Sequence, residues 1–288
     1  MVLESLISPI EAEQKPNRLI FYGILYSSIA IILSLWIFRE QSSLIMVFLT
    51  VLATIPLIYN TLKIEEKKDE GNYNERRILR EHWKALSYFM YLFIGFVIAF
   101  SLWYIFLPVN SVETLFSTQI STIKSINSNL IRVSLPSGAF NQQDILYKIV
   151  DNNVRVLLFT LLFSFFYGAG AIFILTWNAS VIAGAIGIYI RNNISKVTSV
   201  MGMSELSQYF SIFSVGFLRY MTHGAFEIFA YFIGALAGGI ISVAVVRNDI
   251  YSKKFMHVAK DVFILIILAV LFIFLGSMVE VYITPQLF

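Results

Sequence analysis

The sequence predicts an all-α protein, a polytopic transmembrane bundle of about seven helices, and three observations support this prediction. Hydrophobic residues make up 58% of the 288 residues, and the mean hydropathy is +0.75. Charged residues make up only 14%, well below the roughly one quarter that is usual in a soluble domain. Apolar runs long enough to cross a bilayer as helices recur along the chain.

The predicted N-terminal three-span region, 1–107, contains the first three apolar runs, at 19–38, 43–59 and 86–107. A very short polar break separates the first two runs, which predicts a tight helical hairpin. A charged segment at 61–85 precedes the third run. We interpret this segment as a solvated cytoplasmic loop, or alternatively as a docking surface for a cytoplasmic ATPase or another envelope protein.

The segment 108–153 is rich in Ser, Thr, Asn and Gln, which predicts an outer polar loop. Its length indicates a role beyond connecting two helices. The predicted membrane core, 154–288, begins with a second helical hairpin around the glycine-rich turn at Gly168 and Gly170. Residues 209–218 are apolar but too few to span a bilayer. We expect them to form a re-entrant or interfacial half-helix before two final spans.

The distribution of positive charge predicts the orientation in the membrane. The segments 1–18, 61–85 and 247–260 hold 13 of the 21 Lys and Arg residues. Because loops on the cytoplasmic side are enriched in these residues, we expect a multi-pass protein of the cell membrane with a cytoplasmic N-terminus and an external C-terminus.

A candidate polar cluster begins with His223 and Glu227, which lie four residues apart and therefore share one face of a helix. An ionisable side chain in a membrane helix is energetically unfavourable unless it pairs with another group or takes part in the protein's function. In the predicted topology, polar residues of other spans gather with this pair in the outer leaflet. These further candidates are Arg155, Asn152, Asn153, Arg219 and Glu280, and Asn178 is a deeper candidate near the middle of its span.

Three interpretations of this cluster stay open. It is a closed plug in which Arg155 or Arg219 pairs with Glu227 or Glu280, or a pocket for a lipid headgroup, an ion or a peptide. The third, an intramembrane metal hydrolase, has the least support, because the sequence contains no His-Glu-x-x-His pattern. We expect no cofactor, no metal, no catalytic residue and no nucleic-acid partner.

Small residues recur at every fourth position in two of the predicted spans, and such ridges let helices approach closely. We expect the two ridges to pack against each other, and they would also suit a homo-oligomer. The ridges consist of Ala179, Ala183 and Gly187, and of Ala230, Gly234, Gly238 and Ser242.

Several short motifs follow one another over residues 147–288. They are Asn152-Asn153-x-Arg155 at the start of a helix, Trp177-Asn178-Ala179, His223-Gly224-x-x-Glu227, and Val279-Glu280-Val281-Tyr282-Ile283-Thr284-Pro285. Together, in this order and at this spacing, they resemble the stage II sporulation protein M family of integral membrane proteins. Ala179 departs from the pattern, because the family more often has glycine there, which predicts looser packing at that point.

The family name implies a role in envelope remodelling during spore formation, although members are widespread in organisms that never sporulate. The resemblance implies no catalytic activity, and it leaves the first 146 residues outside the match. Our first hypothesis is a non-enzymatic component of an envelope-associated complex that acts through the outer-leaflet polar cluster. The alternative is a permease-like transport subunit driven by a separate ATPase that docks on 61–85.

Overall fold

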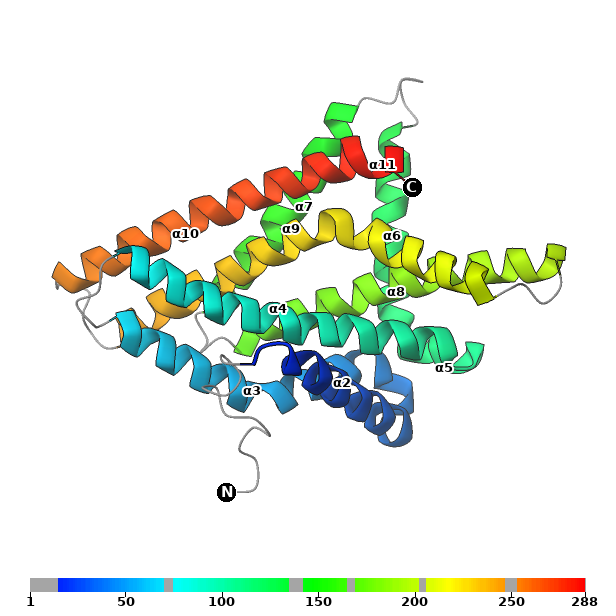
Figure 1. Cartoon of the computed structure of the whole chain (residues 1–288), viewed down its shortest axis with the longest axis horizontal. Coiled ribbons are helices and arrows are strands. Elements are labelled where there is room, and N and C mark those ends of the chain that lie inside the picture. Colours follow the sequence, from blue (N-terminus) through cyan, green and yellow to red (C-terminus); the bar gives the residue numbers. More distant parts are fainter. Residues whose placement is uncertain are drawn as a thin grey trace.

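The computed structural model describes residues 15–69, 75–134, 142–164, 169–201, 206–246 and 253–287. These residues form helices and short connections and contain no strand, which confirms the all-α class. Six helices among them are long and apolar enough to cross a membrane. Figure 1 shows that most of the long helices run roughly along one direction, whereas α6 (Ser117–Ser134) runs across them.

The N-terminal region consists of three long helices, as the sequence predicts. They are α2 (Arg18–Ile37), α3 (Ser42–Asp69) and α4 (Glu75–Phe106). A single 3-10 turn at Arg39–Gln41 joins the first two, so the expected tight hairpin is present. Helix α4 packs along α2 on one side and along α8 (Ala169–Met201) on the other, which ties this region to the rest of the bundle.

Helices α2 and α4 cross where both carry glycine. A Cβ atom at Gly23 would lie 2.5 Å from the carbonyl oxygen of Leu92, and a Cβ at Gly95 would clash with the carbonyl oxygen of Ile20. Real Cβ atoms do not approach a backbone atom so closely. The two backbones therefore touch at this crossing, and only glycine at both positions permits it.

The charged segment 61–85 is not a loop in its described part. Helix α3 continues to Asp69, and α4 begins at Glu75, so both helices extend beyond their apolar runs. The Lys, Arg and Glu residues of this segment are good helix formers, which is the physical reason for the difference. The side chains of 61–85 lie outside the described residues, and docking on this segment stays a prediction.

The expected outer polar loop, 108–153, is also largely helical. It contains α5 (Val109–Leu115), α6, and the first part of α7 (Gln142–Ser164). Its helices do not decide on which side of the membrane this segment lies, and the outer location stays a prediction. Gln119 of α6 is fully buried, and its side chain bonds Ser43 of α3 and Ser180 of α8.

Helix α7 is not among the six helices that are long and apolar enough to span, although the sequence predicts a span there. Its first half carries Asp144, Lys148, Asp151 and Arg155, which lowers its apolar character. Its second half is apolar, and α8 follows after a short connection. Gly168 of the predicted turn lies outside the described residues.

The expected half-helix at 209–218 does not exist as a separate element. It forms the first part of α9 (Leu206–Val246), a continuous helix of 41 residues. The sequence 206–246 contains no proline, so nothing interrupts the hydrogen-bond ladder between the half-helix and the following span. Figure 1 shows that α9 instead changes direction in the yellow part of its ribbon.

The C-terminal helix α10 (Lys253–Met278) ends in a π-helical turn, Val279–Ile283, followed by the short helix α11 (Thr284–Leu287). Pro285 lacks a backbone N–H and cannot continue a regular α-helical ladder. The Val279 carbonyl accepts hydrogen bonds from the backbone N–H of Thr284 and, at 3.1 Å, from the Thr284 hydroxyl. The wide turn sets the position of Glu280.

Candidate functional site

Three side chains of α9 lie at intervals of four residues and share one face of the helix. His223, Glu227 and Tyr231 line the side of α9 that packs against α7 and α10. Tyr231 is 3% exposed, whereas Glu227 and His223 are partly buried. This row of polar groups is the part of the candidate site that the helical spacing positions directly.

Asn153 of α7 links two members of this row. Its amide Nδ2 donates a hydrogen bond to Glu227 Oε1 at 2.5 Å, and its Oδ1 accepts one from the Tyr231 hydroxyl at 2.9 Å. Asn153 itself is 5% exposed. One amide therefore uses both of its ends to join α7 to two turns of α9.

Glu280 completes the acidic part of the site from the π-helical turn. Its carboxyl lies within electrostatic range of Glu227 and of Tyr231. Gly276 makes this possible, because a Cβ at that position would lie only 3.1 Å from Glu227 Cγ and from Phe226 Cβ. The absence of a side chain at Gly276 lets α10 approach α9 beside Glu227.

His223 contacts the same turn from the other end of the row. Its Nδ1 lies 3.4 Å from the Thr284 hydroxyl, with donor and acceptor roles set by the tautomer. Thr284 also bonds the Val279 carbonyl. The structure thus brings together His223, Glu227, Asn153 and Glu280, four of the candidates proposed from the sequence, and we call them with Tyr231 and Thr284 the polar cluster.

The depth of the polar cluster differs from the expectation of an outer-leaflet site. The apolar part of α9 extends from Phe210 to Ser242, so Glu227 lies close to its middle. The sequence placed Glu227 at the mouth of a span because residues 209–218 were assigned to a separate half-helix. The fusion of these two elements places Glu227 within one continuous apolar helix and not at the mouth of a separate span.

Arg155 lies outside the polar cluster, and Arg219 lies one turn before His223 on α9. Arg155 forms an ion pair with Asp151 at 2.7 Å, and both side chains are largely exposed. The Arg219 guanidinium lies over the Tyr189 ring, 5.6 Å from its centroid. Within the described residues, neither arginine forms an ion pair with Glu227 or Glu280, so the pairing expected for a closed plug is absent.

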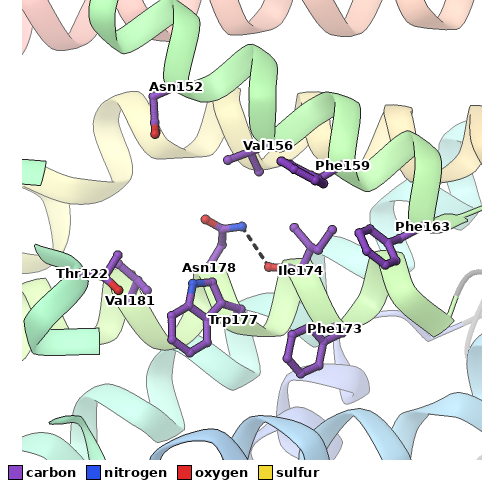
Figure 2. A pocket seen from close by; sticks show the side chains of 10 residues that line it. All are labelled: Thr122, Asn152, Val156, Phe159, Phe163, Phe173, Ile174, Trp177, Asn178 and Val181. Atoms are coloured by element: carbon purple, nitrogen blue, oxygen red, sulfur yellow. Dashed lines mark hydrogen bonds between the residues drawn. The ribbon is translucent and has the colours of Figure 1, made fainter. Parts of the chain in front are cut away.

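Asn152 and Asn178 also lie apart from the polar cluster. Both line a groove between α7 and α8 (Figure 2), on the side of α7 that faces away from α9. Asn178 donates to the Ile174 carbonyl at 2.9 Å. The pattern Asn152-Asn153 thus places two neighbouring amides in two different sites, because successive residues point to different faces of a helix.

Two members of the polar cluster were missed by the sequence reasoning. Tyr231 continues the spacing of His223 and Glu227 by one further turn, and this signal was available in the sequence. Thr284 directly precedes Pro285 in the motif that also contains Glu280, but only Glu280 of this motif was proposed as a site residue. Its contact with His223 depends on the π-helical turn, which the sequence pattern did not predict.

The small residues are buried as expected, but the two ridges do not pack against each other at their glycines. Gly234 and Gly238 face α7, where a Cβ at Gly238 would lie 2.7 Å from the Leu161 carbonyl oxygen. Gly187 instead accommodates the ring of Tyr104 from α4. The other ridge residues, Ala179, Ala183, Ala230 and Ser242, are at most 1% exposed.

The arrangement of the polar cluster favours hydrogen bonding and proton exchange over metal binding. Two carboxyl groups, an amide, a phenol, a hydroxyl and an imidazole offer both donors and acceptors. Within the described part of the chain, no group of three or more His, Asp or Glu residues is placed to hold a metal ion.

Comparison with known proteins identifies a family match for most of the chain. The family model described as stage II sporulation protein M matches residues 85–285. The match begins within α4, so the expectation that the first 146 residues lie outside it is wrong. The N-terminal hairpin, formed by α2 and α3, precedes it. No curated protein and no solved structure matches the chain.

Proposed function

The chain belongs to the stage II sporulation protein M family, and from this premise we propose that it is a non-enzymatic membrane component of an envelope-associated complex. The proposed working part is the polar cluster. In this function the cluster sets how α7, α9 and the C-terminal turn pack together, and so determines the surface that the bundle offers to a partner.

The observation that supports this proposal is the bond between Asn153 and Glu227. A carboxyl group near the middle of an apolar helix is costly, and such residues are found where function requires them. Among the described residues its hydrogen-bond partner is a neutral amide from another helix and not a cation. An interhelical bond of this kind couples helix positions.

The surroundings of the bond fit a coupling role. Asn153 also accepts from Tyr231, and His223 contacts Thr284 of the C-terminal turn. A movement of α7 relative to α9 would break both bonds of the amide together. A change of packing at the polar cluster would therefore reach α10 and α11 through Glu280 and Thr284.

Affinity purification of the tagged full-length protein from native membranes tests the proposal. We expect wild type to retain a defined set of envelope proteins, measured by quantitative mass spectrometry, and Glu227→Leu to lose most of that set. Leu158→Ala is the matched control, because Leu158 lies on α7 and is 52% exposed. A wild-type protein that retains no partner above an untagged control would contradict the proposal.

A permease-like transport subunit is the second candidate, and the two carboxyl groups of the polar cluster favour it. Ionisable side chains that face the interior of a membrane bundle often mark ion and proton pathways. Glu227→Gln separates the two functions, because glutamine keeps an acceptor for Asn153 but cannot exchange a proton. A coupling role predicts that Glu227→Gln retains the partner proteins. A transport role predicts that proton uptake by proteoliposomes is lost in this variant.

A further inference from the structure

The groove between α7 and α8 lies outside the polar cluster and has no assigned role. Its volume is about 470 Å³, and its walls come from α6, α7 and α8. Figure 2 shows Val156, Phe159 and Phe163 of α7 on one wall, with Ile174 and Trp177 of α8 opposite. The groove is open to the outside of the bundle along the half of α7 that is apolar.

The groove is polar at one end and apolar at the other. Figure 2 shows Asn152, Asn178 and Thr122 toward one end, and Phe163 and Phe173 toward the other. The rings of Phe159 and Phe163 stack with centroids 6.3 Å apart. A ligand that follows the whole groove must therefore be amphipathic, with a polar group at the asparagines and an apolar tail along the phenylalanines.

The two asparagines at the polar end retain unused hydrogen-bonding capacity. The Asn178 amide nitrogen donates to Ile174, and within the described residues no partner is found for its Oδ1. Asn152 is exposed and has no hydrogen-bond partner among the described residues. Amide groups without partners are costly in a membrane environment, so this end of the groove favours a ligand with its own polar atoms.

The dimensions of the groove match one hydrocarbon chain in one leaflet. Eleven residues separate Asn152 from Phe163, a distance of about 16 Å along a helix, and half of a bilayer core is about 15 Å. The groove is therefore about as long as one acyl chain within one leaflet.

The polar end of the groove lies on the same side of the bundle as the turn between α2 and α3. Thr122 is one turn along α6 from Thr118, whose hydroxyl accepts a hydrogen bond from Ser43 at the start of α3, at 2.9 Å. The exposed ion pair of Asp151 and Arg155 flanks Asn152 on α7, so charged groups lie at the level of the polar end of the groove.

We propose that this groove is a binding site for one phospholipid of the leaflet on the side of the α2–α3 turn. One acyl chain lies along the phenylalanines, and its ester carbonyl region binds the amides of Asn152 and Asn178. The headgroup lies beyond the asparagines, toward the start of α7. This site is separate from the polar cluster, so it does not depend on the function proposed above.

Photolabelling tests the site in the full-length protein. The protein is reconstituted in vesicles of phosphatidylethanolamine and phosphatidylglycerol that contain a small share of phospholipid with a diazirine near the end of one chain. Val156→Trp places an indole in the groove, and Leu158→Trp places one on the exposed side of the same helix. Thermal unfolding checks that both variants fold.

We expect wild type and Leu158→Trp to be labelled at the apolar end of the groove, and labelling there to fall about tenfold in Val156→Trp because the indole fills the chain's space. Asn152→Leu, an exposed substitution, should reduce labelling about fivefold through loss of one hydrogen bond. Equal labelling of all four proteins would overturn the proposal, since it would indicate unselective contact with the bilayer. Crosslinks to a second copy of the chain at this groove would also overturn it.

Discussion

The carboxamide of Asn153 uses both of its ends, the nitrogen toward Glu227 and the oxygen toward Tyr231. These two partners lie one helical turn apart on α9, so a single side chain on α7 fixes the position of that turn. An aliphatic side chain of similar size could form neither hydrogen bond, so Glu227 and Tyr231 would each lose this partner. Asn152, the next residue, lies on another face of α7 and is exposed.

Substitution of Asn153 by leucine should lower the free energy of unfolding by about 1–3 kcal/mol, because two interhelical hydrogen bonds are lost and two buried polar groups lose a partner. Reversible unfolding in mixed detergent micelles measures this change. Asn152→Leu is the control and should change the same free energy by less than about 0.5 kcal/mol. Equal effects of the two substitutions would show that the hydrogen bonds of Asn153 do not stabilise the bundle.

The sequence predicts most residues of the polar cluster, but it does not predict which residues their side chains bond. The spacing of His223 and Glu227 indicates a common face, and this face is the one that meets α7 and α10. The neutral partner of Glu227 was not predictable, because Asn152 and Asn153 are equivalent in the sequence and only the rotation of α7 separates them. The arginines were expected to pair with these carboxyl groups. Arg155 instead forms an ion pair with Asp151, and the Arg219 guanidinium lies over the Tyr189 ring.

Among the secondary-structure elements, the hydrophobic periodicity and run length placed α2, α3, α4 and α8 well. Periodicity and run length did not predict the elements whose length depends on the segments next to them. The first part of α9 is too short to span alone, yet it continues into the next span because no residue interrupts the helix. Helices α5 and α6 were taken for a loop because their polar residues, such as Gln119, bond other helices and not solvent.

The crossing of α2 and α4 offers a test at this scale. Gly95→Ala should lower the free energy of unfolding by about 1–3 kcal/mol, because its methyl group would meet the backbone of α2 and the helices would have to separate. Gly224→Ala is the control, because the nearest atom to its Cβ would be Met221 Cε at 4.0 Å. In a helix this change should be neutral or stabilising by up to about 1 kcal/mol. If both variants unfold alike, the close crossing of α2 and α4 does not contribute to stability.

Across the whole molecule, the family match and the packing do not divide the chain in the same way. The match to residues 85–285 covers the apolar part of α4 and everything that follows up to α11. The α2–α3 hairpin precedes it, although α2 packs closely on α4. The hairpin is therefore an addition to the family region that shares its core. Its short turn also gives a clear marker for the side of the membrane on which the groove's polar end lies.

The orientation of the bundle can be tested at the two ends of α2, because the chain has no native cysteine. Lys15 and Glu40 are exposed and flank α2, whose 20 residues are long enough to cross a bilayer. From the distribution of positive charge, we expect Glu40→Cys to react with a membrane-impermeant maleimide in intact cells. Lys15→Cys should react only after the membrane is permeabilised. The opposite pattern would invert the orientation and move the phospholipid groove to the inner leaflet, and reaction at both positions in intact cells would show that α2 does not span.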